Sequence, residues 1–154
     1  SFSANLEASQ TINPAAGTYD LATNPNVSMA SGDFTPDFQS TVQIYDSLGG
    51  IRTLAMSFMK SPTANEWFAE VHVVPASDLQ ASGRPDGILA SGVVAFTSDG
   101  QLDLANSTLP STIDILASNA TATDPQVGWA TASGLAASKI AFCFFKIDER
   151  SGRI

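Results

Sequence analysis

Few side chains in this sequence could carry out acid–base chemistry. The single histidine, His72, follows Glu70 by two residues in a segment of alternating apolar and polar residues. In a strand the two side chains point the same way, about 7 Å apart, as a histidine–carboxylate pair would need. A solvated strand face gives the same pattern and is far more common. We therefore expect Glu70 and His72 to lie on an outward, solvent-exposed face.

Three other features have residue types that bind ligands elsewhere. The segment 99–103 has two carboxylates beside a glycine, but a calcium loop needs more oxygen ligands, so we predict a hairpin turn. Cys143 stands between phenylalanines, where a packed thiol is expected, although Lys146 could lower its pKa. Trp67 could line a sugar-binding surface, but the apolar residues that alternate with it favour a core position. We predict no catalytic residue, no metal and no cofactor.

Composition limits the protein class. The 154 residues suit one domain with its own core, and one cysteine excludes an intrachain disulfide. The formal net charge of −8 argues against a nucleic-acid partner. No apolar run reaches the roughly 20 residues that span a bilayer, so no membrane partner is expected. Residues 1–5 have no signal-peptide pattern, and we expect the chain to be a piece of a longer protein.

The elements that must position these residues are strands. We expect one β-domain over residues 1–154, with a first strand and an irregular arm in 1–40, a β core in 41–147 and a frayed tail in 148–154. Phe34 and Phe38 are the expected anchors of the arm. A weak helical pattern is confined to residues 133–139.

The core pattern is a series of hairpins. Expected strands are 41–45, 52–60, 66–73, 92–96, 101–104, 112–116 and 140–145. Asp46, Gly49 and Gly50 are predicted to set the first turn, and Asp99 and Gly100 the turn of a later hairpin, since glycine supplies positive φ. Short strands with Gly/Pro turns predict an all-β fold, either a β-sandwich or a partly closed barrel with long irregular loops. The predicted core residues are Leu54, Met56, Phe58, Trp67, Val71 and Phe96.

Four segments, in order, resemble the outer domain of bacterial flagellar hook proteins. Residues 42–49 (VQIYDSLG) resemble that family's V-x-V-Y-D-S-x-G strand and turn. Residues 52–60 resemble its second strand, residues 65–67 (NEW) its N-x-W, and residues 94–102 its L-x-F-x-x-x-G-x-L hairpin. The resemblance covers residues 40–104 well and 140–146 weakly, and the first forty residues match nothing in the family's pattern.

The resemblance implies a structural, non-enzymatic role. It implies a mostly β outer domain of the hook subunit, located outside the cell in the flagellum and exported by the flagellar type III apparatus. The implied partners are other copies of the same subunit, which would meet through weak, sliding contacts while the hook acts as a universal joint. We expect the isolated chain to be monomeric. A distal rod protein and an extracellular adhesin or carbohydrate-binding module are alternatives, and an enzyme is a more distant one.

Overall fold

The computed structural model describes residues 4–80, 85–123, 125–142 and 147–150, and these form strands and short 3-10 helices without an α-helix. The strands are β1 (Ala4–Glu7), β2 (Phe38–Tyr45), β3 (Ile51–Lys60), β4 (Glu66–Val74), β5 (Ile88–Phe96), β6 (Leu102–Asp103), β7 (Thr112–Leu116), β8 (Val127–Gly128), β9 (Ser138–Ala141) and β10 (Ile147–Arg150). The 3-10 helices are η1 (Ala16–Thr18), η2 (Ala76–Asp78), η3 (Pro85–Gly87) and η4 (Thr131–Ser133). The all-β prediction is confirmed.

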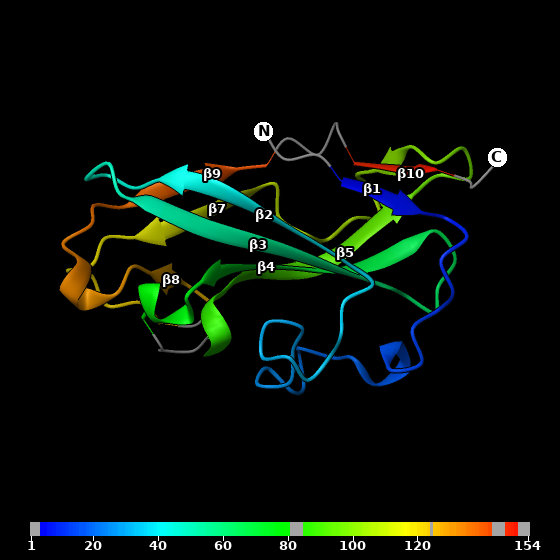
Figure 1. Cartoon of the computed structure of the whole chain (residues 1–154), viewed down its shortest axis with the longest axis horizontal. Helices are drawn as coiled ribbons and strands as arrows, with labels where there is room; N and C mark the ends of the chain where they lie inside the picture. Colours follow the sequence, from blue (N-terminus) through cyan, green and yellow to red (C-terminus); the bar gives the residue numbers. More distant parts are fainter. Residues whose placement is uncertain (1–3, 81–84, 124, 143–146, 151–154) are drawn as a thin grey trace.

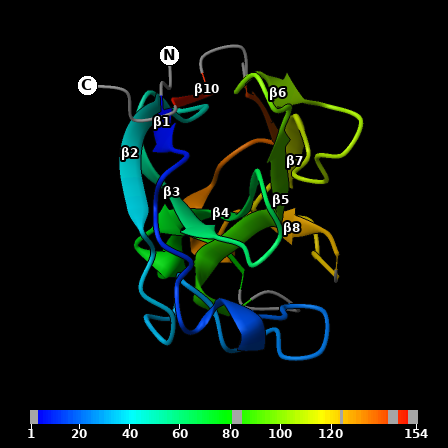
Figure 2. The same cartoon turned by 90° about the vertical axis from the view of Figure 1, so that its right-hand side faces the viewer.

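The largest sheet is an antiparallel meander in the order β2-β3-β4-β5-β6. β2, β3 and β4 follow one another along the chain with short turns between them, so they pair as consecutive hairpins. The β4–β5 register shifts between Val71 and His72, an irregularity of the kind that bends a sheet. Viewed along the long axis, the sheet curls into half a barrel (Figure 2).

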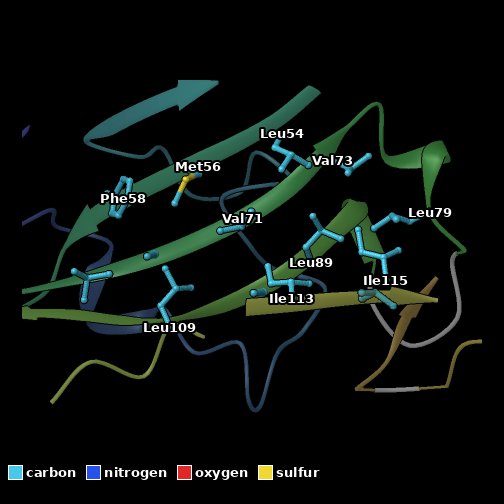
Figure 3. Packing of buried hydrophobic residues seen from close by; sticks show 14 of the residues in the cluster. Leu54, Met56, Phe58, Val71, Val73, Leu79, Leu89, Leu109, Ile113 and Ile115 are labelled. Carbon is cyan, nitrogen blue, oxygen red and sulfur yellow. The ribbon is translucent and has the colours of Figure 1, made fainter. Parts of the chain in front are cut away.

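A second sheet, in the order β8-β7-β9, packs against the inner side of the curl (Figures 1 and 2). Side chains from β3, β4, β5 and β7 meet between the two sheets (Figure 3). β1 pairs in parallel with β10 in a small third sheet, and Leu6 of β1 joins the same core. The architecture is therefore a partly closed barrel with a second layer.

All six predicted core residues lie in this cluster: Leu54, Met56, Phe58, Trp67, Val71 and Phe96. Alternation puts them there because every second residue of a strand faces the curl. On the opposite face of β3, however, Ala55, Ser57 and Met59 are also buried. Something must therefore cover the outer face of the sheet as well.

Several element boundaries differ from the expected ones. β2 begins at Phe38 rather than at residue 41, so Phe38 belongs to the sheet and packs against Phe58, with ring centroids 6.1 Å apart. β5 begins at Ile88, inside a segment expected to be loop. A weak helical pattern was expected over residues 133–139, but the helical turn η4 covers residues 131–133 and β9 covers residues 138–141. Residues 143–145 of the expected last strand, Cys143 among them, lie outside the described residues.

The C-terminal tail also differs from expectation. Sequence patterning placed a frayed segment over 148–154, yet residues 148–150 belong to β10 and pair with β1. A charged edge strand lacks the apolar alternation that identifies strands, so the pairing is set by a distant segment rather than by the local sequence. Residues 151–154 lie outside the described residues.

Candidate functional site

The expectation that Glu70 and His72 face solvent is wrong. Glu70 is fully buried and His72 is 7% exposed. The face that carries Glu70 is covered by the arm, here defined as residues 13–37, which crosses beneath β3 and β4 (Figure 1). Nothing in the strand pattern itself could reveal this cover, because the alternation is the same whether or not the polar face is covered.

Glu70 holds the arm by three hydrogen bonds. The Tyr19 hydroxyl donates to Oε1 at 2.7 Å, the Met29 amide donates to Oε1 at 2.9 Å, and the Ala30 amide donates to Oε2 at 2.9 Å. Burying a carboxylate is costly unless hydrogen-bond donors satisfy it, and the three donors found here all come from the arm. Glu70 is therefore a structural anchor rather than half of an acid–base pair.

Apolar contacts surround this anchor. Ala16, Met29 and Phe34 of the arm form a small cluster with Met59 of β3, and Tyr19 and Phe68 pack against it. The Tyr19 ring lies 5.2 Å from Phe34 and 4.8 Å from Phe68. Burial, with the nearby Glu70 carboxylate, raises the pKa of Tyr19, so its hydroxyl stays protonated and remains a donor. Phe34 lies where the sequence analysis expected an arm anchor, whereas Tyr19 and Glu70 were missed.

His72 occupies the same strand face, nearer to η3. Its Nδ1 atom is buried and has no hydrogen-bond partner among the residues that the structure describes. Burial lowers the pKa of His72, and the charge of Asp86 opposes that shift. His72 is therefore a nearly buried imidazole on the covered face of β4, with Asp86 as its charged neighbour.

The turn between β2 and β3 is organised by Asp46. Its Oδ1 accepts from the Leu48 and Gly50 amides at 3.0 and 2.8 Å, and its Oδ2 accepts from Arg52 Nε at 2.8 Å. The Arg52 hydrogen bond is the main cause of a lowered pKa of Asp46. Gly49 has φ +82°, and a Cβ on Gly50 would lie 2.7 Å from Asp46 Oδ2. The positive φ favours glycine at position 49, and a Cβ at position 50 would force the Asp46 carboxylate to shift.

Arg52 connects this turn to the rest of the molecule. Its Nη1 donates to Asp78 Oδ2 at 2.9 Å, and its guanidinium lies 6.0 Å from the ring centroid of Trp129. Across the same turn, the Ala136 amide donates to Ser47 Oγ at 2.9 Å. The hydrogen bonds to Asp78 and Asp46 raise the pKa of Arg52, so the guanidinium stays charged. The end of the first hairpin is thus fixed to η2 and to the segments around the second sheet.

The turn between β5 and β6 repeats the backbone pattern of the first. The Gly100 amide donates to Thr97 O at 2.9 Å, and the Thr97 amide donates to Gln101 O at 2.8 Å. In the first turn, the Gly49 amide likewise donates to Asp46 O and the Asp46 amide donates to Gly50 O. Gly100 has φ +79°. This is the three-residue hairpin loop that ends in a left-handed residue. Asp103 caps the next loop through its bond from Asn106, which lowers the pKa of Asp103.

The surface presents two features that sequence reasoning missed. Tyr45, Leu48 and Ile51 at the end of the first hairpin are 76%, 71% and 56% exposed. Near β6, an open hollow of about 320 Å³ is lined by Val94, Leu102, Leu104, Ser107, Leu109 and Ser111. The glycine turn signalled a hairpin end, but only the sheet register shows which side chains remain uncovered there.

The described residues were also compared with what a metal site or a membrane-spanning helix requires. Within the described ranges, no cluster of three or more His, Cys, Asp or Glu side chains is arranged to hold a metal ion. Among the same residues, no helix is long and apolar enough to cross a membrane. The polar groups described above bind one another, and so the arrangement serves to hold segments together.

Comparison with known proteins agrees with this architecture. Residues 5–151 match the family described as the flagellar basal body protein FlaE D2 domain. The flagellar hook protein FlgE of Caulobacter vibrioides is 36% identical over 113 residues, which cover 65% of this chain and 19% of that protein. A 32 kDa fragment of the flagellar hook protein FlgE from Caulobacter crescentus superposes with a TM-score of 0.65 at 22% identity, over 92% of this chain and 50% of that one.

The chain thus spans about a fifth of the curated relative and half of the solved fragment. The structural likeness supports the fold, and the sequence match supports the family. The resemblance to the outer domain of hook proteins, stated from residues 42–104, is confirmed. Since the family match includes nearly every residue, the chain belongs to the family of flagellar basal body protein FlaE D2 domains.

Proposed function

We propose that this chain forms an outer β-domain of a flagellar hook subunit and acts as a structural element, not as an enzyme. The family match over residues 5–151, together with the similarity to a hook protein, carries the proposal. In this role the domain lies outside the cell in the flagellum, reaches it through the flagellar type III apparatus, and meets other copies of the same subunit. It needs no cofactor, nucleic acid or membrane.

The contacts between copies are weak and are re-formed as the hook bends. The exposed side chains of β2 support this view, because Gln39, Thr41, Gln43 and Tyr45 are all uncharged. Sliding past such side chains breaks no ion pair at each step. Contacts of this kind fall below the roughly 800 Å² per partner of a standard stable interface, so the isolated chain is monomeric.

A distal rod protein is the second candidate, because the matched family is described as a basal body protein. The relatives named as hook proteins favour the hook. For the adhesin or carbohydrate-binding alternative, Trp67 was the side chain that could line a sugar-binding surface, and Trp67 is 1% exposed. The burial of that ring removes the main observation in favour of sugar binding.

Antibodies against this chain, applied to isolated hook–basal bodies from the bacterium that encodes it, test the proposal by electron microscopy. We expect labelling along the curved hook. Labelling confined to the straight rod would instead support the rod alternative, and absence of label from both would reject a structural role in the flagellum. A strain whose subunit lacks this chain is the control, and its hooks should remain unlabelled.

A further inference from the structure

An apolar projection closes one end of the molecule. Tyr45 and Ile51 are register partners on β2 and β3, so their side chains share one face, and Leu48 sits in the turn between them. We call these three residues the knob. The neighbouring charges are satisfied within the chain, since Arg52 pairs with Asp46, whose side chain is only 1% exposed. The knob is therefore an uncharged, apolar surface.

An apolar hollow lies near the opposite end. Leu109 and Val94 are buried at its wall, while Leu104, which is 61% exposed, stands at its rim. None of the six residues named above as its lining is charged. Its volume of about 320 Å³ is roughly twice that of a ~150 Å³ apolar cavity that holds a benzene ring. It has room for a tyrosine ring or for a leucine with a neighbour.

The two features lie toward opposite ends of the long axis. Figure 1 shows the turn between β2 and β3 at the left end, and β6 with the chain that follows it toward the right end. A projection at one end of one copy and a hollow near the far end of another copy can therefore meet when the two copies lie end to end. A head-to-tail contact of this kind, repeated from copy to copy, would build a ring or an open filament.

We propose that the knob of one copy of this chain inserts into the hollow of the next copy. The choice of a second copy rests on the proposed function, in which identical subunits assemble. Charge supports it, because chains with a net charge of −8 repel each other and can approach most closely where both surfaces are neutral. Asp103 near the hollow is already engaged by the side chain of Asn106.

The contact is small. The one or two side chains that fit into the hollow bury far less than the roughly 800 Å² per partner of a stable interface. A single contact is therefore weak, and it becomes effective where other parts of the subunit raise the local concentration. This is compatible with a monomeric chain in dilute solution.

Disulfide capture tests the contact directly. One preparation carries Leu48→Cys and a second, isotopically heavier preparation carries Leu104→Cys, both in a Cys143→Ser background. They are mixed at high concentration and oxidised, and the dimers are separated by mass. Both positions are exposed, so thermal unfolding should match that of the Cys143→Ser parent. We expect mixed dimers to exceed the share that random pairing gives.

Val27→Cys, a 40% exposed position on the arm, replaces Leu48→Cys in the control and should give the random share. If Leu48→Cys also gives mixed dimers only at the share expected for random pairing, the proposal is overturned. An excess of Leu48→Cys homodimers would overturn it in favour of a two-fold contact. If capture succeeds and antibody labelling of hooks fails, the contact stands and the proposed function is rejected. If labelling succeeds and capture fails, the proposed function stands and the contact is rejected.

Discussion

At the scale of single residues, Glu70 shows how a polar side chain can stabilise a tertiary contact instead of acting on a substrate. Its carboxylate accepts hydrogen bonds from Tyr19 and from the Met29 and Ala30 amides. The Glu70→Gln substitution would place the NH₂ group of the glutamine side chain against one of these three donors, so at least one hydrogen bond would be lost. Hydrogen bonds to a buried charged group contribute about 1.5–3 kcal/mol. We expect a loss of about 2 kcal/mol in the free energy of unfolding.

Chemical denaturation measures this loss, and limited proteolysis should show faster cleavage within the arm. Glu7→Gln is the matched control, because Glu7 is exposed and, among the described residues, its carboxylate accepts a hydrogen bond only from Ser9 Oγ, at 2.8 Å. It should change stability by less than about 0.5 kcal/mol. Equal effects of the two substitutions would contradict the role of Glu70 as the arm's anchor.

His72 predicts a pH dependence of stability. Burial lowers the pKa of His72 from its ordinary 6.5, so the unfolded chain takes up a proton before the folded chain does. Stability is therefore unaffected by this group above about pH 6.5 and falls as the pH drops below that value toward the lowered pKa. Denaturation between about pH 7 and 5 should show this decline, and it should be weaker in His72→Gln. An unchanged slope would show that His72 does not titrate differently in the two states.

At the scale of elements, the first hairpin could be predicted from its residues and the arm could not. The alternation of β3 and β4 and the D-S-L-G-G turn are local signals, and local geometry decides them. The burial of Glu70, by contrast, depends on residues forty or more positions away in the sequence. The pairing of β10 with β1 is likewise set by distant contacts. A pattern of period two specifies which residues share a face, and it carries no information about what covers that face.

The first turn yields a prediction about glycine. A Cβ on Gly50 would come within 2.7 Å of Asp46 Oδ2, and that carboxylate is already held by two amides and Arg52. Gly50→Ala must displace it, and overpacking of this kind costs about 1–3 kcal/mol. Gly17→Ala is the control, since a Cβ there meets nothing within 4 Å and its φ is not positive. Thermal unfolding compares them, and a neutral Gly50→Ala would show that the turn rearranges freely.

At the scale of the whole molecule, charge and apolar surface act against each other. Fifteen acidic residues against seven basic ones give each copy a field that repels another copy. The knob and the hollow would instead attract another copy, over a small area. Which tendency prevails depends on salt, because the Debye length shortens from about 30 Å at ~0.01 M to about 8 Å at ~0.15 M ionic strength.

Self-association should therefore strengthen as salt is raised. At micromolar concentration the chain should sediment as a monomer in either salt, because the contact is too small to hold a dimer. At much higher concentration, sedimentation equilibrium should show weak association that increases from low to physiological ionic strength, and Leu48→Ser should reduce it. Association that weakens with salt would mean that ion pairs hold the copies together. Since Arg52 is already paired inside the chain, that outcome would place the contact on a surface other than the knob.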